Sequence, residues 1–452
     1  MKKIPTKFQG HKYNDFIKKV AENNEINFQY ARLIPFYKPG DEISLTSIFL
    51  SGLRLIKEFR QNIFKILGLT LTGKVHIFTE IEFKYFDNQR IDGLILIERS
   101  GKIIDSIILE VKNKNNELNA DQIQRYIKIA QAYKISKILT ISNQFVNFPT
   151  QSPIQVRMPK SFQMYHFSWS YILTLAHILL FDNKTNIEDR DQIEIMNEIL
   201  NYFESPKSGI LGFVQMKPGW TDVSHKVNTG ASLKVNDDDV DEAVSSWLEE
   251  ERDMALILSK KLGLFVKSGN NKFKKDLNGR IKFEKQSLIK NKFVESNLNV
   301  EGAVSDIRVR PHFGRKNVEF SVKVSTPEDR NLRPQITWIK NQLLKCKKRN
   351  EEGFNRIQEN LMLDIYVKFS NDPIRFQFKE IDYAFEKLTG KHIKYFNISY
   401  VSYFGKKFES RKLFISNIEE SLTTYYQVIV QHLLNWKKTA PKVNTSETIN
   451  LS

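Results

Sequence analysis

Two acidic residues and a lysine are spaced so that they could hold a metal ion beside an anionic substrate. Glu110 and Lys112 lie two apart in the sequence ILEVKNK, and Asp92 stands in the apolar run before it. On a strand, residues two apart leave from the same face. Carboxylates on an apolar hairpin are costly unless a cation compensates them. A hard cation held there could activate water against a phosphodiester, and the lysine would add positive charge where the transition state needs it.

The elements that carry these residues read as a β-hairpin. Ile91–Ile97 and Ile103–Val111 are rich in β-branched residues, and a short loop with a glycine separates them. If the loop comprises residues 99–101, Asp92 falls opposite Ile108. Asp92 and Glu110 are then diagonal neighbours on one face, with backbones roughly 7–8 Å apart.

The surrounding segments predict an α/β fold. Apolar residues recur at helical spacing over Ile43–Leu67, and the period changes to two from Val75 onward. After the hairpin, Leu118–Tyr133 has the pattern of a helix and Ile135–Ile141 that of a strand. This order indicates a mixed sheet flanked by helices.

The motif Ile91-Asp92-Gly93, followed by Glu110-Val111-Lys112 and by a helix with Gln122 and Tyr126, resembles the PD-(D/E)XK nuclease superfamily. The resemblance covers about residues 40–145 and is strongest to the RecB-like branch. It implies a restriction-endonuclease-like fold and a Mg²⁺ or Mn²⁺ ion. Isoleucine stands at position 91, where the family usually has proline.

The resemblance also assigns roles to these residues. Asp92 and Glu110 would ligate the metal, helped by the carbonyl of Val111. Lys112 would orient or activate the attacking water and stabilise charge on the phosphate. Gln122 and Tyr126 would position the site. A further acid comes from upstream in this family, and here we favour Glu80 over Glu58.

The charge distribution favours a polyanionic partner. Lys and Arg outnumber Asp and Glu by 69 to 52, a formal charge of +17. The excess is concentrated in residues 251–350, which hold 24 Lys and Arg against 10 Asp and Glu. Binding to a phosphate backbone needs such a concentration. We therefore expect a nucleic acid, most simply DNA, as partner.

The same basic stretch repeats the rhythm of the first hairpin. Asp306 would correspond to Asp92 and Lys323 to Lys112, with Ser321 in place of Glu110. Such a degenerate, nuclease-like copy would not cleave, because a metal ion would lack a ligand; chance similarity between two hairpins is the alternative. If they share a face, a set of cations and rings would form a nucleic-acid-binding surface: Arg308, Arg310, Arg315, Lys316, Lys323, Phe313 and Trp338.

Composition and motifs bound the remaining properties. The sequence predicts a nuclease domain over residues 1–150, a helical connector over 151–238, a basic α+β domain over 239–437 and a disordered tail over 438–452. The single cysteine, the lack of a secretory signal and the shortness of the longest apolar run predict a cytoplasmic protein that does not engage a membrane.

These observations predict a Mg²⁺-dependent endonuclease acting on DNA, and analogy suggests restriction or phage defence. Two alternatives stay open: a non-catalytic nucleic-acid-binding or interaction module that retains the fold, and an RNA-cleaving effector. A protein partner or a homo-oligomer stays open as well. The histidines show no metal-binding spacing, and no phosphate-binding P-loop motif occurs.

Overall fold

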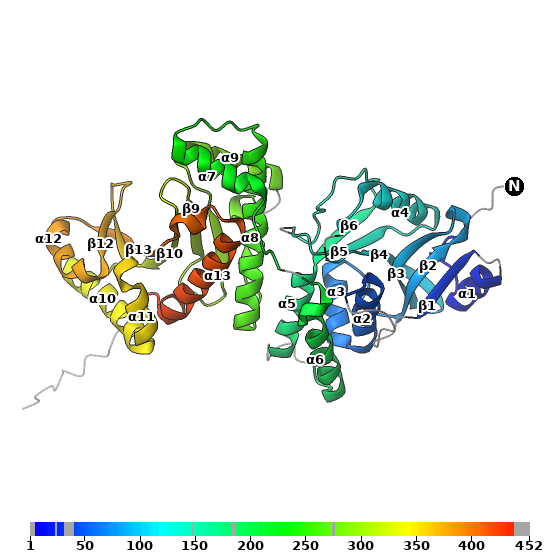
Figure 1. The fold of residues 1–452 in the computed structure, drawn as a ribbon. Helices are drawn as coiled ribbons and strands as arrows, with labels where there is room; N and C mark the ends of the chain where they lie inside the picture. Colours follow the sequence, from blue (N-terminus) through cyan, green and yellow to red (C-terminus); the bar gives the residue numbers. More distant parts are fainter. Residues whose placement is uncertain are drawn as a thin grey trace, which may run out of the picture. The chain divides into compact units, whose positions relative to one another are not determined.

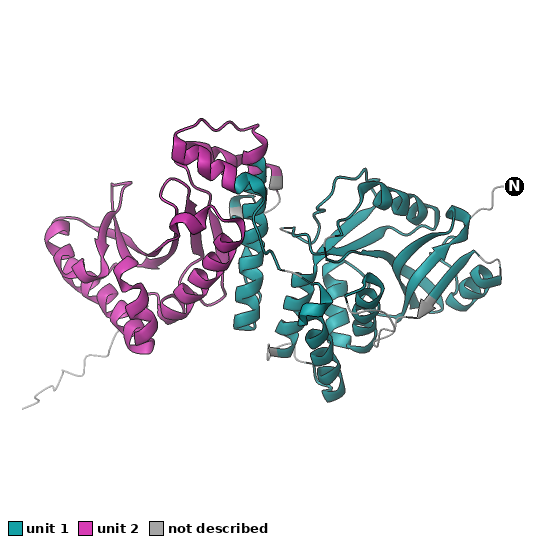
Figure 2. Cartoon of the chain, viewed as in Figure 1, with its two compact units in different colours: residues 1–220, 241–275 teal, residues 221–240, 276–452 magenta. Residues whose placement is uncertain are grey.

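The computed structural model describes residues 5–22, 25–30, 40–114, 116–146, 148–181, 187–210, 212–273 and 276–437. Figure 1 gives the labels of the elements. The chain forms two compact units: unit 1 comprises residues 1–220 and 241–275, and unit 2 comprises residues 221–240 and 276–452 (Figure 2). The tail predicted over 438–452 lies outside the described residues.

Unit 1 is built on a mixed sheet with the strand order β1-β2-β3-β4-β5-β6. Strands β1 to β4 are antiparallel, whereas β5 and β6 run parallel to β4 and to each other. Residue 150, the predicted end of the first domain, lies inside this unit because β6 still extends the sheet. The strands of this sheet are β1 Ile26–Tyr30, β2 Lys74–Phe83, β3 Gln89–Arg99, β4 Lys102–Val111, β5 Lys137–Ser142 and β6 Gln163–Ser168. The short strand β7, Lys267–Ser268, is not part of it.

Helices cover both faces of this sheet (Figure 1). On one face, Ile123 and Ile127 of α4 join a buried cluster with Leu94 and Ile108 of the hairpin. On the other face, α2 packs against β2 and β3. The helices of unit 1 are α1 Tyr13–Glu22, α2 Glu42–Leu55, α3 Lys57–Ile66, α4 Ala120–Ala132, α5 Trp169–Phe181 and α6 Arg190–Glu204, with 3₁₀ turns η1 Lys84–Phe86, η2 Pro206–Ser208 and η3 Asn271–Phe273.

The helix predicted over Ile43–Leu67 is interrupted at Ile56, which has extended backbone angles. Arg60 stabilises the break, because its Nη1 donates hydrogen bonds to the carbonyls of Leu53 and Arg54 at 2.8 and 3.0 Å. These carbonyls belong to the last turn of α2, where the helix leaves acceptors unpaired. The apolar period continues through the break, so spacing alone did not reveal it.

Unit 2 contains an antiparallel sheet in which β12, β11, β13, β10, β9 and β8 are neighbours in that order. The mixed α/β class predicted from sequence is therefore confirmed for the chain. The strands are β8 Ser296–Asn299, β9 Ile307–His312, β10 Asn317–Ser325, β11 Leu361–Val367, β12 Ile374–Gln377 and β13 Ile393–Tyr403.

Helices α10 and α13 pack on one face of this sheet (Figure 1), where Trp338 meets Phe396 and Tyr425 meets Phe320. The helices of unit 2 are α9 Leu277–Asn291, α10 Leu332–Arg349, α11 Glu351–Ile357, α12 Ala384–Leu388 and α13 Arg411–Val428, with 3₁₀ turns η4 Gln358–Asn360, η5 Phe378–Tyr383, η6 Gly405–Phe408 and η7 Val430–His432. Helices α7 Pro218–Thr229 and α8 Asp238–Leu262 each contribute residues to both units.

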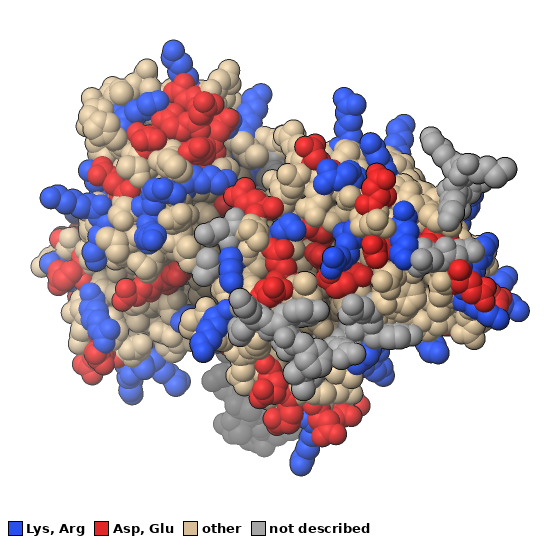
Figure 3. Space-filling model, turned by 45° about the vertical axis from the view of Figure 1, so that its right-hand side comes forward, with Lys and Arg blue, Asp and Glu red and all other residues tan. Residues whose placement is uncertain are grey.

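The surface carries charges of both signs. On the face drawn in Figure 3, Lys and Arg are interspersed with Asp and Glu, so the net positive charge is not gathered into one uniform patch there. Within the described residues, no helix is long and apolar enough to cross a bilayer.

Candidate active site

The hairpin that carries the predicted site forms, but its turn is shorter and its strand pairing differs from the prediction. Its loop comprises only Ser100 and Gly101, both with positive φ (53° and 75°), which is typical of a two-residue hairpin turn. The register then shifts at Ile97 and Glu98, so that Ile104 is an extra residue on β4. The predicted pairing of Asp92 with Ile108 is wrong, because Ile108 pairs with Leu94.

Continuing the observed register places Asp92 directly opposite Glu110. The last pair of the ladder is Gly93 with Leu109, and Asp92 is the next residue on β3. The backbone N–H of Val111 donates a hydrogen bond of 2.7 Å to Oδ2 of Asp92. This bond fixes the Asp92 carboxylate beside the end of β4. The two acids are therefore direct cross-strand neighbours, which lie closer than a diagonal pair.

Gly93 allows the helix layer to approach the hairpin at this point. A Cβ added to Gly93 would lie 2.9 Å from Cδ1 of Leu50 on α2 and 3.1 Å from Cβ of Leu109. The glycine after Asp92 therefore serves close packing between α2 and the sheet. This packing positions the amino-terminal turn of α2 with respect to the hairpin.

Burial raises the pKa of both carboxylates. The pKa of Asp92 lies well above its usual value, first because of desolvation and second because of the Glu110 charge; the Val111 N–H and Lys112 offset only part of this. The pKa of Glu110 is also raised by burial, against the opposing effect of Lys112. Two neighbouring acids with raised pKa values, one buried and one half-buried, are typical of a functional site.

Lys112 is the counter-ion of this pair. Its Nζ lies 2.6 Å from Oε1 of Glu110 and 3.7 Å from Oε2 of Glu42. Burial alone would lower the pKa of Lys112, but the charges of Glu110, Asp92 and Glu42 outweigh it, so the pKa is raised. The lysine is therefore a fixed ammonium at neutral pH. The sequence did not predict that Glu42, in the first turn of α2, would join it.

Asn113 connects Glu42 to the end of β4. The buried Nδ2 of Asn113 donates to the carbonyls of Gly40 (2.9 Å) and Ser208 (2.7 Å), and its backbone N–H donates to Oε1 of Glu42 at 3.1 Å. Gly40 has a positive φ of 75°, and a Cβ there would lie 2.6 Å from the carbonyl oxygen of Lys207. One amide thus ties together three segments around the hairpin.

We expect Asn113→Ala to destabilise unit 1 by about 2 kcal/mol, because two carbonyls would lose their donor inside the protein. Asn116→Ala is the matched control: its Nδ2 donates to the same Glu42 oxygen at 2.9 Å, but Asn116 is exposed. That substitution should change stability by less than about 0.5 kcal/mol. If urea unfolding showed the same loss of unfolding free energy in both variants, the hydrogen bonds of Asn113 to Gly40 and Ser208 would not be the source of the stabilisation.

Gln122 and Tyr126 lie one turn apart on α4, beside the acids. Nε2 of Gln122 donates to the hydroxyl of Tyr126 at 2.7 Å, and that hydroxyl donates to the carbonyl of Arg90 at 2.8 Å. Desolvation, followed by the charge of Glu110, raises the pKa of Tyr126. The tyrosine therefore stays neutral and anchors α4 to the strand just before Asp92.

Glu80 and Glu58, the two upstream acids considered from sequence, occupy different surroundings. In register, Glu80 stands opposite Asp92, but its φ of 52° interrupts the ladder there. Its Oε2 accepts from Nη1 of Arg90 at 2.8 Å, and its charge contributes a minor upward shift to the pKa of Asp92. Glu58 lies on α3 and influences the pKa of Arg60. Strained backbone at Glu80, next to the acids, fits a functional position.

The donor set suits a hard divalent cation. Within the described residues, neither oxygen of Glu110 has a well-oriented hydrogen bond, although Lys112, Tyr126 and Asp92 all lie close enough to lower its pKa. One oxygen of Asp92 accepts from Val111, and the carbonyl of Val111 points to the same side of β4 as its N–H. Carboxylate and carbonyl oxygens are the ligands that Mg²⁺ and Mn²⁺ prefer.

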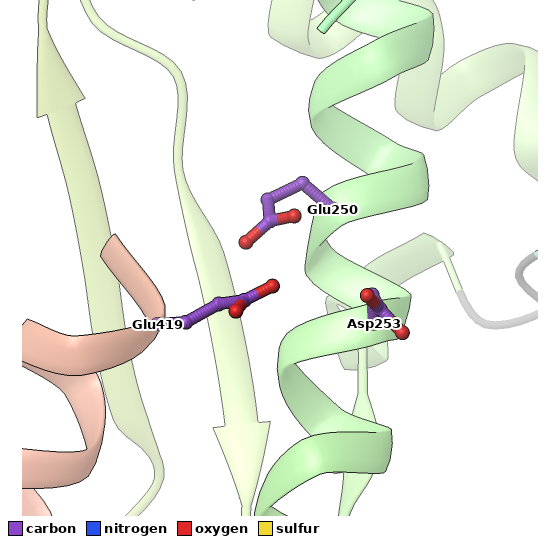
Figure 4. Close-up of side chains that lie close together, drawn as sticks. All are labelled: Glu250, Asp253 and Glu419. Carbon is purple, nitrogen blue, oxygen red and sulfur yellow. The ribbon is translucent and has the colours of Figure 1, made fainter. Parts of the chain in front are cut away.

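Raised carboxyl pKa values also occur elsewhere in unit 1, where packing explains them. One example is Asp253, which projects from α8 (Figure 4). Burial raises the pKa of Asp253 to about 7, while its Oδ2 accepts a hydrogen bond of 2.9 Å from the backbone of Phe213. Asp253 thereby holds the chain segment around Phe213 against α8. Asp253 therefore has a structural role, with a backbone N–H as its partner.

The predicted copy in unit 2 has a different register. Ser321 of β10 pairs with Arg308 of β9, and Asp306 would come opposite Lys323. The neighbour of β10 on its other side is β13, which is antiparallel, whereas β4 has the parallel neighbour β5. The correspondence proposed from the sequence rhythm is therefore not reproduced, because the turn between β9 and β10 sets another pairing.

The cations and rings predicted to share a surface are only partly brought together. Arg308 and Lys323 line one cavity of unit 2. The remaining members have other partners or places: Arg310 pairs with Glu295, Lys316 with Glu409, Arg315 is exposed in the turn, Phe313 is buried against Phe408, and Trp338 packs on Phe396 and Trp436.

Comparison of the chain with protein-family models, with curated proteins and with solved structures finds no match in any of the three.

Proposed function

We propose that unit 1 is a metal-dependent nuclease that hydrolyses phosphodiester bonds, acting on DNA in the cytoplasm. The observation that supports this most directly is the cross-strand pair of Asp92 and Glu110 beside the fixed ammonium of Lys112. The two carboxylates offer oxygens to a cation, and a single lysine balances only part of their charge. This is also the residue pattern that resembles the PD-(D/E)XK nucleases, whose restriction-endonuclease-like fold we propose for unit 1.

The proposal gives each residue of the candidate site a definite role. Asp92, Glu110 and the carbonyl of Val111 would hold Mg²⁺ or Mn²⁺. The bound ion would supply an activated water and would neutralise the phosphate. Lys112 carries its proton at neutral pH, so it serves as a positive charge facing the phosphate rather than as a base. Gln122 and Tyr126 hold α4 against β3 and keep the carboxylates in place.

The direct test is cleavage of supercoiled plasmid, linear duplex, single-stranded DNA and RNA by the purified chain with Mg²⁺ or Mn²⁺. We expect products that increase with time and disappear in EDTA. Preferential cleavage of RNA would show that RNA, and not DNA, is the substrate. If the metal changed the stability of the chain but no substrate were cleaved, the hydrolase proposal would be wrong, and a non-catalytic binding module would be the better description.

The raised pKa values predict that the stabilisation by Mg²⁺ grows with pH. Above the ordinary pKa of 3.8, the metal-free folded state keeps more protons on Asp92 than the unfolded state does, so this contribution to stability decreases as pH rises. A bound cation replaces those protons. The shift in melting temperature caused by Mg²⁺ should therefore be larger at about pH 8 than at about pH 5.5.

Asp92→Asn provides the control for this pH effect, because an amide does not titrate in that range. The pH dependence of the Mg²⁺ shift should be much weaker in the variant. A Mg²⁺ shift that is independent of pH in the unmodified chain would mean that the ion binds away from the two acids.

A further inference from the structure

Unit 2 contains a polar cavity of about 280 Å³ on its antiparallel sheet. Side chains of β9, β10, β11 and β13 line it, together with those of the segment before β9 and of β8. The lining includes one acid, two cations, a hydroxyl and two rings: Asp306, Arg308, Lys323, Ser321, Tyr366 and Tyr395.

The cavity lies on the sheet face that α10 and α13 do not cover. In β10, Phe320 and Val322 are buried on the face toward these helices, while Ser321 and Lys323 alternate to the other face. The cross-strand partners of these two residues, Arg308 and Asn397, share that face. The strands therefore present a polar surface at a place where an antiparallel sheet can face solvent.

Two cations stand on this surface, and among the described residues neither forms a salt bridge with an acid. Nε of Arg308 donates to the hydroxyl of Ser321 at 3.2 Å, and in the described part of the chain the other guanidinium nitrogens have no acceptor. Nζ of Lys323 lies 4.3 Å from the centroid of the Tyr395 ring. The one acid in the lining, Asp306, accepts a hydrogen bond of 2.7 Å from Asn299. The cavity thus offers more positive than negative charge.

Stacked rings form one wall. Tyr366 and Tyr395 are cross-strand partners whose ring centroids are 4.4 Å apart at an interplanar angle of 21°. The cation–π contact holds the ammonium of Lys323 over the Tyr395 ring. A phosphate carried on a strand with unstacked bases would find cations for its oxygens and rings for an adjacent base.

We propose that this cavity binds a phosphate of a single-stranded nucleic acid, with Arg308 and Lys323 as its cationic contacts and the tyrosine pair beside the neighbouring base. The choice of nucleic acid as the occupant rests on the proposed nuclease function and on the basic excess of residues 251–350. The cavity would anchor the substrate strand, and it requires no metal ion.

The test measures fluorescence anisotropy of a labelled single-stranded oligonucleotide with the full chain in EDTA, where cleavage is prevented. The double variant Arg308→Gln, Lys323→Gln should bind about tenfold more weakly or worse. The slope of log affinity against log salt should become shallower by about 0.7 for each phosphate that the variant no longer neutralises. A matched double variant removes two exposed lysines of unit 2 outside the cavity: Lys348→Gln and Lys412→Gln.

If both double variants bound the oligonucleotide equally weakly, the loss of affinity would come from net charge alone, and the cavity would not be a specific site. Tighter binding of duplex than of single strand would overturn the single-strand assignment. A nucleoside monophosphate that displaces the oligonucleotide at similar concentration would identify a free nucleotide as the occupant. A chain that binds the oligonucleotide but cleaves no substrate would contradict only the nuclease proposal.

Discussion

Asp92→Asn should abolish cleavage and, in the absence of metal, should leave unit 1 at least as stable as before. Asparagine keeps an oxygen that can accept the hydrogen bond from Val111, so the local geometry is preserved. It removes a half-buried carboxyl group whose pKa is already raised by desolvation and by Glu110. Cleavage should fall by about a thousandfold or more, because the cation loses an anionic ligand.

The same substitution should remove most of the stabilisation by Mg²⁺. Thermal unfolding in EDTA and in Mg²⁺ measures both effects, and the transition that responds to the metal must be followed because two units need not unfold together. The neighbouring surface acid provides a control: Asp121→Asn, in the first turn of α4, should leave both cleavage and the metal shift unchanged. An Asp92→Asn variant that still responds fully to Mg²⁺ would remove this residue from the metal site.

The sequence was sufficient to place the hairpin but not its register. Alternation and the glycine turn located β3 and β4 to within two residues of their observed ends. The extra residue Ile104 could not be foreseen, because a bulge depends on how both strands pack and not on a local signal. One bulge together with a shorter loop changed Asp92 from a diagonal to a direct neighbour of Glu110.

Local sequence patterns also could not predict that α2 would contribute Glu42 to the site. Glu42 reads as an ordinary acid in a first helical turn, a preference that the helix dipole explains by itself. Its approach to Lys112 depends on the hydrogen bonds of Asn113 to Gly40 and Ser208, which join three segments that are distant from one another in the sequence. A motif of three residues therefore predicts chemistry, whereas the surrounding support is set by tertiary packing.

In unit 2, alternation along the strands decides which predicted residues can meet. Arg308 and Lys323 leave from the polar face, but Trp338 belongs to α10 and packs on Phe396 from the opposite side. The predicted rings came from segments close in sequence, whereas the rings beside the two cations, Tyr366 and Tyr395, lie on strands further along the chain. Sheet order, which long connections determine, could not be read from periodicity.

Lys112→Met should also lower cleavage, by about a hundredfold or more, but its effect on stability should be opposite to that of Asp92→Asn. Methionine keeps much of the length of the side chain and removes the ammonium that lies 2.6 Å from Glu110. A buried carboxylate then loses its counter-ion, which costs about 3 kcal/mol in the metal-free protein. The melting temperature in EDTA should therefore fall.

Mg²⁺ should recover much of that loss, because the ion can take over the role of the missing charge beside Glu110. The metal-induced shift in melting temperature should thus be larger in Lys112→Met than in the unmodified chain, although cleavage stays low. Lys114→Met, an exposed lysine two residues away, should leave all three quantities unchanged. If Lys112→Met instead lost the response to Mg²⁺, the lysine would be required to hold the acids in position, and its proposed role as a charge for the phosphate would be wrong.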